Sequence, residues 1–372
     1  MNICVVSQDY PDSKRVVFPF VKNLVDMWGQ LGHKVTVISP FSVTHNKVMK
    51  PFEELPHPSN VDIVRPLSIS FSNIKLFGIP ITERAHCVSV NRALERSKIM
   101  PDIIYCHFWD QAIAAYNFAK KKKIPLVVAT GESVIPKHLG EEPYRSICNY
   151  VSRVVCVSSK NMNESIELGL TTEEKCCVFP NGIDTNLFKV TNETKLKKQL
   201  GIQKTDFVLA FVGWFIERKG SLRVSRAIEK LDDSKVKILF IGKGPDEPTC
   251  NGILFKGSLP HNEVPKYLNC ADAFILPTLA EGCCNAVVEA MACGLPIISS
   301  NKDFNRDVLN DENSIMVNPM DVDELVKAIA TLRDDEKKRR AMSKASIKTV
   351  ENLKIELRAK RIIEYIGASL MK

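Results

Sequence analysis

Short apolar runs recur along the chain, and each is followed by a longer stretch in which apolar residues keep a helical spacing. A run of roughly four to eight apolar residues between turn-forming residues is typical of a strand buried on both faces. In the first half we expect such strands at residues 2–7, 34–40, 61–66, 102–107, 125–130, 153–159 and 175–179. In the second half we expect them at residues 207–215, 236–242, 252–255, 271–277, 296–300 and 314–318.

Helices are predicted between these strands. The clearest cover residues 20–31, 111–119, 221–231 and 264–269, and after residue 321 the chain is expected to be helical to its end. Strands that alternate with helices at this spacing predict parallel sheets with helices on both faces. The fold class predicted from the pattern is therefore α/β, with two doubly wound halves that are not sequence repeats of each other.

The stretch at residues 277–298, PTLAEGCCNAVVEAMACGLPII, predicts a strand end, a loop, a short helix and the next strand. Asn285 is placed to cap the helix through its side-chain oxygen, and Gly294 is placed to end it in the left-handed conformation. Glu281 lies in the loop, and Glu289 lies one turn after Asn285 on the same helix face. The loop N–H groups and both carboxylates are thus expected to converge on one small volume.

That volume suits one kind of ligand. A helix start attracts phosphate through its oriented N–H groups and its positive dipole end. A carboxylate accepts two hydrogen bonds from a vicinal diol. Phosphate and diol together indicate a nucleotide sugar, whereas the alternative is an ordinary strand–helix turn that carries two surface glutamates.

Four motifs in a fixed order carry a family resemblance. They are E-G-x-x-N-x-x-x-E followed by A-M-A-C-G-L-P at residues 281–296, PNGIDTNLF at 180–188, VGWFIERKG at 212–220 and IGKGP at 241–245. Together they resemble the motifs of the retaining GT-B glycosyltransferases of family 4, and the similarity extends over almost the whole chain. Four ordered motifs are far more specific than any single one.

The resemblance implies a GT-B fold, in which two Rossmann-like domains with doubly wound parallel sheets face a cleft. It implies an acceptor-side domain at residues 1–187, a nucleotide-sugar-binding domain at 188–354, and a last helix at 355–372 that crosses back to the first domain. The implied reaction moves a sugar from a nucleotide-sugar donor to an acceptor hydroxyl with retention, in cell-surface polysaccharide or glycolipid assembly.

Lys219 precedes a glycine and a predicted helix start, so its ammonium and the helix N–H groups can hold a diphosphate. The alternative for Lys219 is a solvated lysine at a helix start. With the resemblance, Glu281 would orient the donor sugar hydroxyls and Glu289 the ribose diol, while Glu132 could accept a sugar or acceptor hydroxyl. The other donor-binding residues implied are Arg218, Gly242, Gly244, Leu259, Gly282, Cys283, Cys284 and Asn285.

The acceptor side is expected at the carboxyl ends of the first-half strands, because that edge of an open parallel sheet faces the ligand crevice. His107 and Trp109 lie at the end of the strand at 102–107. An aromatic side chain there could stack on a sugar or acceptor; equally, Trp109 could pack at the top of the sheet. Gly131 follows the next strand and permits a close backbone approach.

The chain departs from the family pattern in three places. The loop at residues 8–20, QDYPDSKRVVFPF, has none of the usual glycines. Lys14 and Arg15 could hold an anionic group there, or the loop could simply be solvated. Gly131 stands where the family often has a histidine, which weakens any prediction of catalytic detail on that side.

The third departure is Trp214, which stands where the family pattern has an arginine. That arginine normally acts with Lys219 on the leaving diphosphate, and Arg218 could supply the missing charge or could point to solvent. These departures keep open a non-catalytic GT-B subunit that binds nucleotide or glycan. A GT-B epimerase or phosphorylase is a further alternative, although no lysine site for the phosphorylase cofactor is found. A dehydrogenase is disfavoured because no G-x-G-x-x-G follows the first strand.

The resemblance implies no metal and no cofactor. The expected donor is a nucleotide sugar, with a UDP-sugar favoured over a GDP-sugar, and the expected acceptor is a lipid-linked or other saccharide. The net charge of +8 over 372 residues permits contact with an anionic membrane surface and does not argue for nucleic acid. The lysines at 120–123 could form part of such a surface, or could simply complement the end of a helix dipole.

Twelve cysteines lack the C-x-x-C and Cys/His spacings of zinc sites, so we expect free thiols in a reducing compartment. A secretory signal has a basic region before its apolar run, and the N-terminus of this chain has no such region. No stretch approaches the roughly 18 apolar residues of a spanning helix. The sequence therefore predicts a cytoplasmic protein whose membrane association, if any, is peripheral.

Overall fold

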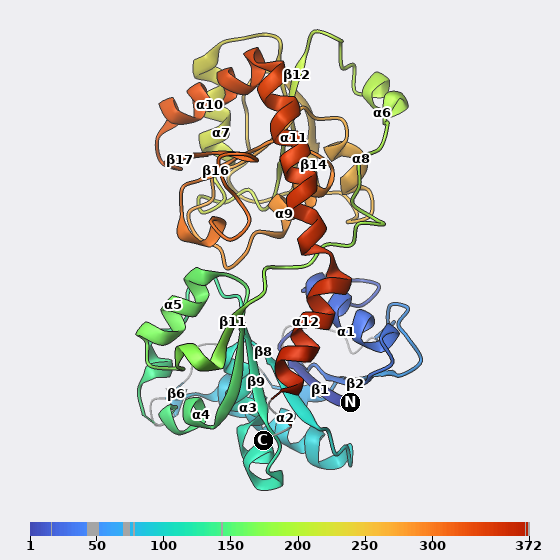
Figure 1. Cartoon of the computed structure of the whole chain (residues 1–372), viewed down its shortest axis with the longest axis vertical. Coiled ribbons are helices and arrows are strands. Elements are labelled where there is room, and N and C mark those ends of the chain that lie inside the picture. The colour runs from blue at the N-terminus through green and yellow to red at the C-terminus, as the bar shows by residue number, and fades with distance from the viewer. Residues whose placement is uncertain are drawn as a thin grey trace. The chain divides into compact units, whose positions relative to one another are not determined.

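The computed structural model describes residues 1–15, 17–42, 52–69, 75–76, 79–142, 144–368 and 370. It separates into two compact units, Met1–Phe179 with Ile355–Lys372, and Pro180–Lys354 (Figure 1). The first unit therefore ends before the PNGIDTNLF motif rather than at residue 187, and the last segment of the chain belongs to it.

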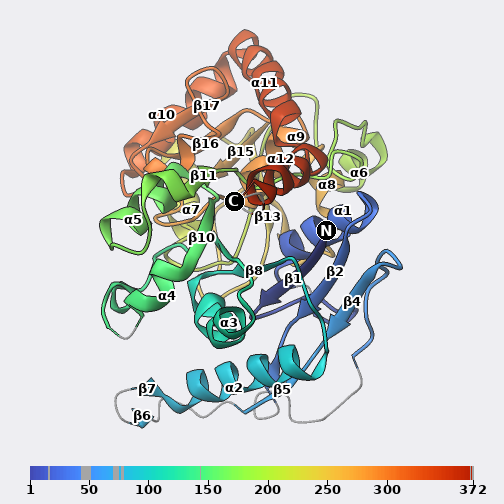
Figure 2. The ribbon, with the colours of Figure 1, turned by 60° about the horizontal axis from the view of Figure 1, so that its bottom comes forward.

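The first unit contains a seven-stranded sheet in the order β11-β10-β9-β8-β1-β2-β4, and every pairing in it is parallel. Figure 2 shows β1, β2 and β4 side by side. The strands are β1 (Asn2–Ser7), β2 (Lys34–Ile38), β4 (Val61–Val64), β8 (Ile103–His107), β9 (Leu126–Thr130), β10 (Val151–Cys156) and β11 (Cys176–Val178). Each predicted strand of this half is present.

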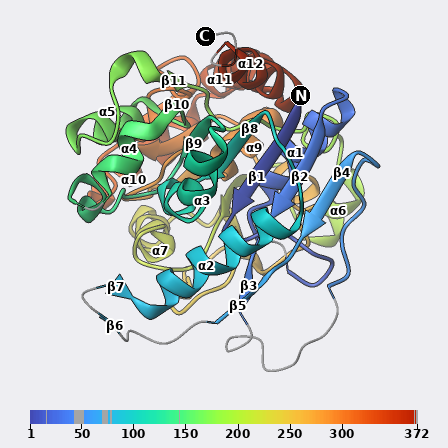
Figure 3. The same cartoon turned by 90° about the horizontal axis from the view of Figure 1, so that it is seen from below.

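Helices cover both faces of this sheet because its strands are apolar on both sides. One apolar cluster lies under α2 and α3, and the other lies under α1 and α12; in Figure 3, α2 and α12 lie on opposite sides of the strands. The helices are α1 (Pro19–Gln30), α2 (Ile81–Arg96), α3 (Trp109–Lys122), α4 (Arg145–Tyr150), α5 (Ser159–Glu167) and α12 (Ile355–Gly367).

Several elements of the first unit were not predicted. The most extensive is α2, and α4 and α5 are others. Two short strand pairs also occur, β3 (Phe41–Ser42) with β5 (Leu67–Ser68), and β6 (Lys75–Leu76) with β7 (Ile79–Pro80). Across both units, the short 3-10 helices within the described residues are η1 (Lys137–Gly140), η2 (Glu173–Lys175), η3 (Asp303–Asn305) and η4 (Glu351–Leu353).

The second unit contains a six-stranded parallel sheet in the order β14-β13-β12-β15-β16-β17. Its strands are β12 (Phe207–Val212), β13 (Val236–Ile241), β14 (Ile253–Gly257), β15 (Ala273–Leu276), β16 (Ile297–Ser300) and β17 (Ser314–Val317). Its helices are α6 (Thr194–Gln199), α7 (Ser221–Leu231), α8 (Val264–Leu268), α9 (Asn285–Ala292), α10 (Val322–Asp334) and α11 (Glu336–Val350). The strand order reverses between β12 and β15, and such a switch point is where open α/β sheets bind ligands.

The last helix, α12, completes the core of the first unit. Ile355, Ala359, Ile362 and Ile366 lie in the same apolar cluster as residues of β1 and α1. The indole Nε1 of Trp28 in α1 donates a hydrogen bond of 3.1 Å to the Ala359 carbonyl. Among the described residues, no helix is both long and apolar enough to span a membrane.

Candidate active site

Two loops of the second unit bring three charged side chains together at the switch point. The loop after β12 carries Arg218 and Lys219, and the loop after β15 carries Glu281. One carboxylate oxygen of Glu281 lies 2.6 Å from Lys219 Nζ and 2.5 Å from an Arg218 guanidinium nitrogen. The same oxygen accepts a hydrogen bond of 3.0 Å from the Thr278 hydroxyl. Arg218 thus contacts the same carboxylate oxygen as Lys219, and its contribution to binding a diphosphate stays a prediction.

Hydrogen bonds to backbone carbonyls also hold the two loops in place, which fixes the cluster. The Leu279 N–H donates to the Arg218 carbonyl at 2.8 Å, and Arg223 of α7 donates to the Pro277 carbonyl at 3.0 Å. Burial alone would lower the pKa of Lys219, but the neighbouring Cys284 and Glu281 outweigh burial and raise the pKa. Lys219 is therefore a cation held at the carboxyl edge of the sheet.

Gly242 and Gly244 lie in the loop after β13, packed against the loop after β12. A Cβ atom on Gly242 would fall on the Gly213 carbonyl oxygen, and one on Gly244 would fall on the Phe215 carbonyl oxygen. Only glycine allows such a close approach of two backbones. Leu259 lies partly exposed in the loop that follows β14, farther along the same edge.

Helix α9 begins at Asn285, so the prediction that Asn285 caps the helix was wrong. Cys284 is the N-cap, and no side chain caps the helix start. The Asn285 side chain is instead held in the first turn, where its Oδ1 accepts a hydrogen bond of 2.7 Å from Asn181 Nδ2. Asn181 also donates to the Cys283 carbonyl at 3.3 Å, which ties the PNG turn to this loop. The predicted helix end is confirmed, because Gly294 has a φ of 76°.

Glu289 lies on α9 and is buried. Its Oε1 is 2.9 Å from Nε2 of His261, which lies in the loop after β14. The His261 ring packs against Phe188 with a centroid distance of 5.2 Å. Burial alone would lower the pKa of His261, but the hydrogen bond and charge of Glu289 outweigh burial and raise it. Sequence reasoning did not find this pair, since nothing in the GSLPH stretch specifies a partner 28 positions away.

The Glu132 carboxylate of the first unit is bound by its own surroundings. It accepts hydrogen bonds from the Thr130 hydroxyl at 2.6 Å, the Gly131 N–H at 2.8 Å and the Trp109 N–H at 3.2 Å. Burial raises the pKa of Glu132, and these hydrogen bonds oppose that rise. Glu132 thereby joins the start of α3 to the loop after β9. A Cβ on Gly131 would lie 3.2 Å from the methyl groups of Val157, so this position is closely packed.

His107 and Trp109 are buried, with exposed fractions of 7% and 2%. The Trp109 ring lies in the apolar cluster under α2 and α3, so the packing alternative holds and this ring is not available for stacking on a sugar. His107 contacts the rings of Phe18, Phe20 and Phe108. Burial lowers the pKa of His107 to about 3, so its imidazole is neutral.

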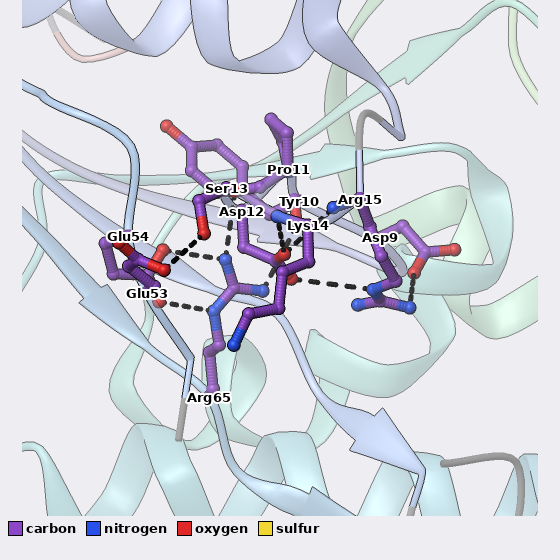
Figure 4. A network of polar contacts seen from close by, with 10 residues as sticks. All are labelled: Asp9, Tyr10, Pro11, Asp12, Ser13, Lys14, Arg15, Glu53, Glu54 and Arg65. Carbon is purple, nitrogen blue, oxygen red and sulfur yellow. Dashed lines mark hydrogen bonds and ion pairs between the residues drawn. The ribbon is translucent and has the colours of Figure 1, made fainter. Parts of the chain in front are cut away.

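The loop that lacks the family's glycines is held by polar side chains (Figure 4). Arg65, which follows β4, donates to both carboxylate oxygens of Glu54 at 2.5 and 2.8 Å. The same guanidinium donates to the Tyr10 and Pro11 carbonyls at 3.2 and 3.1 Å. A bidentate, buried arginine of this kind fixes the loop path through side chains.

The basic residues of this loop do not both remain available for an anion. The Asp12 carboxylate accepts from the Lys14 and Arg15 N–H groups at 2.8 and 3.0 Å, which forms a tight local turn. The Arg15 side chain forms ion pairs with Asp12 and Asp9. The loop is therefore not simply solvated, and Arg15 is already paired with two carboxylates.

Two family descriptions match the chain. "Glycosyltransferase Family 4" matches residues 19–187, and "Glycosyl transferases group 1" matches residues 192–349. The chain belongs to the family 4 (group 1) glycosyltransferases. Three of the four sequence motifs lie inside the match at residues 192–349.

Curated relatives of this glycosyltransferase agree with the assignment. TuaC of Bacillus subtilis (strain 168), assigned as a glycosyltransferase to teichuronic acid biosynthesis, is 28% identical over 88% of each chain. The UDP-Gal:alpha-D-GlcNAc-diphosphoundecaprenol alpha-1,3-galactosyltransferase of Escherichia coli is 24% identical over 68% of this chain and 72% of its own.

Solved structures show the same fold. Sucrose-phosphate synthase from Thermosynechococcus elongatus superposes with a TM-score of 0.78 over 99% of each chain, at 17% identity. HepE of Anabaena, solved in complex with UDP and glucose, superposes with a TM-score of 0.74 over 99% of this chain and 100% of its own, at 16% identity. The GT-B fold class predicted for this glycosyltransferase is confirmed.

Within the described residues, the glycosyltransferase contains no group of three or more His, Cys, Asp or Glu side chains placed to hold a metal ion. All twelve cysteines are free thiols, most of them buried.

Proposed function

We propose that this glycosyltransferase transfers a hexosyl group from a UDP-sugar to an acceptor hydroxyl with retention at the anomeric carbon. The observation that carries the proposal is the cluster of Arg218, Lys219 and Glu281 at the switch point of the second sheet, beside the uncapped start of α9. Cations and helix N–H groups stabilise a departing diphosphate, and a carboxylate binds sugar hydroxyls.

Each side chain has a separate role in this proposal. Lys219 and Arg218 neutralise the diphosphate as the bond to the anomeric carbon breaks, and this electrostatic stabilisation supplies most of the rate enhancement. Glu281 then exchanges part of its present contact with these cations for the sugar hydroxyls. Glu289 holds the ribose diol, with His261 fixing the orientation of the Glu289 carboxylate through the 2.9 Å contact.

The proposed nucleotide is UDP. The E. coli relative is named for UDP-galactose, and the Anabaena neighbour was solved with UDP. The loop after β14, which contains Leu259, would contact the base through its main chain. Glu132 remains a candidate for binding an acceptor hydroxyl, which would have to replace one of its three present donors.

The proposed acceptor is a saccharide on a lipid carrier, reached from the cytoplasmic face of a membrane. The E. coli relative is named for a diphosphoundecaprenol-linked acceptor. In the first unit a groove beside α2, which lies next to β5 in Figures 2 and 3, has an apolar lining that includes the exposed Leu67, Ile69 and Val88. Arg92 and Arg96 also line it. Apolar side chains with adjacent cations suit an anionic lipid surface.

Basic residues of α3 extend this surface. Lys121, near the end of α3, lies 2.8 Å from Glu95 of α2, so the carboxyl ends of both helices lie together. The surface predicts binding to vesicles that contain phosphatidylglycerol, weaker binding to phosphatidylcholine vesicles, and loss of binding at high salt. Arg92→Gln with Arg96→Gln should reduce the vesicle-bound fraction without changing UDP binding, and equal binding to both vesicle types would contradict a membrane contact.

The test of the proposed function compares UDP binding with turnover. Glu289→Ala should weaken UDP-sugar binding, and Lys219→Ala should mainly lower kcat, by about a hundredfold or more. Calorimetry and initial rates across a panel of UDP-sugars, with membrane extract as the acceptor source, separate the two effects. Glu312→Gln, an exposed carboxylate of the same unit, is the matched control. Binding without any turnover would favour the non-catalytic subunit, and wild-type activity in both variants would show that the site is misplaced.

A further inference from the structure

Trp214 is exposed to 59%, which is unusual for so large an apolar side chain. It lies in the loop after β12, the same loop that carries Lys219. A Cβ placed on the neighbouring Gly213 would lie 3.6 Å from Cδ of Lys219, so the backbone next to Trp214 packs against the side chain of the lysine in the charged cluster. An exposed aromatic residue therefore lies in the loop that carries Lys219, at the position where the family pattern has an arginine.

The backbone on both sides of Trp214 is fixed. The Phe215 N–H donates a hydrogen bond of 2.8 Å to the Lys243 carbonyl, and the Phe215 ring is buried against Phe211 and Phe240. The Ile216 N–H donates to the Trp214 carbonyl at 3.0 Å. With its neighbour Phe215 anchored in the core, the loop leaves the Trp214 indole exposed.

Lys243, from the β13 loop, places its ammonium 5.9 Å from the centroid of the Trp214 ring. A cation at this distance is attracted by the negative face of the indole and holds it in place. Because Trp214 as a whole remains exposed, its ring is accessible to a ligand. The loop that contains Leu259, which we propose contacts the base, follows β14 on the far side of β13.

We propose that Trp214 is a stacking platform for the pyranose ring of a substrate and helps to determine which sugar the enzyme accepts. This inference rests on the proposed function and names a residue that recognises the sugar. The C–H groups on one face of a pyranose carry partial positive charge and pack against the negative face of an indole. The pyranose is that of the donor or that of the acceptor, and the two sources are distinguished below.

Tryptophan fluorescence can test this directly. The chain has three tryptophans, and Trp28 and Trp109 are buried with exposed fractions of 0% and 2%. Acrylamide quenching of the whole chain should therefore report mainly on Trp214, and Trp214→Phe should remove the quenchable component. We expect UDP-glucose, UDP-galactose or UDP-N-acetylglucosamine to protect Trp214 from acrylamide beyond the protection given by UDP alone.

Three ligand conditions show whether the pyranose that stacks on Trp214 belongs to the donor or to the acceptor. Protection by a UDP-sugar but not by UDP supports stacking of the donor sugar, and protection by UDP with methyl glucoside but by neither alone supports stacking of an acceptor sugar. Full protection by UDP alone would overturn the proposal, because the ring would then cover base or phosphate. If calorimetry detects UDP binding and no condition protects Trp214, the stacking role is contradicted and the nucleotide site is still supported. If no nucleotide binds, the proposed function itself is contradicted.

Kinetics supply a second readout. Trp214→Ala should raise the KM of the sugar substrate roughly two- to tenfold with a smaller change in kcat, and Trp214→Phe should restore much of the loss. Met320→Ala removes an equally exposed apolar side chain elsewhere in the same unit and should leave KM unchanged. Equal KM values for wild type, Trp214→Phe and Trp214→Ala would contradict a stacking role.

Discussion

At the scale of single residues, the negative charge of Glu281 neutralises part of the positive charge of the two cations that contact it. Glu281→Gln keeps the shape and removes the negative charge between Arg218 and Lys219. We expect UDP to bind about two- to fivefold more tightly, because both cations become available to it. We also expect kcat to fall by about a hundredfold, because the donor sugar loses its carboxylate partner. Calorimetry with UDP and initial rates measure the two effects, and weaker UDP binding would contradict this arrangement.

The contact between His261 and Glu289 predicts a pH dependence of stability. The pKa of His261 is raised in the folded protein above its value of about 6.5 in an unfolded chain. The contribution of the pair is therefore fully present below about pH 6.5 and is lost as the pH rises through the folded pKa. The difference in melting temperature between wild type and His261→Gln should shrink from pH 5.5 to pH 8.5. Glu289→Gln should remove the same pH-dependent part, and a difference that grows with pH would contradict the pair.

Which residues could be predicted from sequence depends on how local their chemistry is. Lys219 and Glu281 belong to motifs in which a strand end, a loop and a helix start lie within a few residues, so their common position follows from the strand order. His261 could not be paired with Glu289, because that contact depends on how the β14 loop folds over α9. Trp109 could not be assigned to core or surface, since one aromatic residue at a strand end fits both.

At the scale of elements, the packing of the β12 and β13 loops depends on glycine. Gly242→Ala would place a methyl group on the Gly213 carbonyl oxygen, so the two loops must separate. We expect a destabilisation of at least about 2 kcal/mol and weaker UDP binding. Gly257→Ala is the matched control, because its Cβ meets only the Phe255 ring at an ordinary 3.5 Å. Urea denaturation and calorimetry measure both variants, and equal behaviour of the two would show that the close approach is unimportant.

The strands of both sheets were predicted because each is a short apolar run in a parallel sheet covered on both faces. Helix α2 was missed because its sequence, ITERAHCVSVNRALER, has no run of large apolar residues and no clear cap. The path of the glycine-free loop could not be predicted from the sequence either. It depends on hydrogen bonds from Arg65 to the Tyr10 and Pro11 carbonyls, which are distant in the sequence. Elements defined by local pattern were thus predictable, and those defined by a distant polar partner were not.

At the scale of the whole molecule, the chain returns to its first unit at Ile355. The Ile183 N–H donates to the Leu353 carbonyl at 2.8 Å, so the two ends of the second unit lie side by side. The first unit is therefore built from two separated parts of the sequence, whereas the second is continuous. This organisation predicts that the two units depend differently on the C-terminal residues.

In a truncated protein that ends at Lys354, the first unit should be unfolded and the second unit should remain folded. Without α12, the core loses three buried isoleucines, and Trp28 Nε1 loses its acceptor. Each large-to-small loss in a core costs about 2–5 kcal/mol, so removal of the helix approaches the whole stability of a domain. Limited proteolysis should cleave the first unit rapidly while Pro180–Lys354 survives and binds UDP in calorimetry. A chain that ends at Gly367 keeps α12 and should behave as wild type. Loss of both units together would show that they fold as one, and survival of the first would show that its core does not need α12.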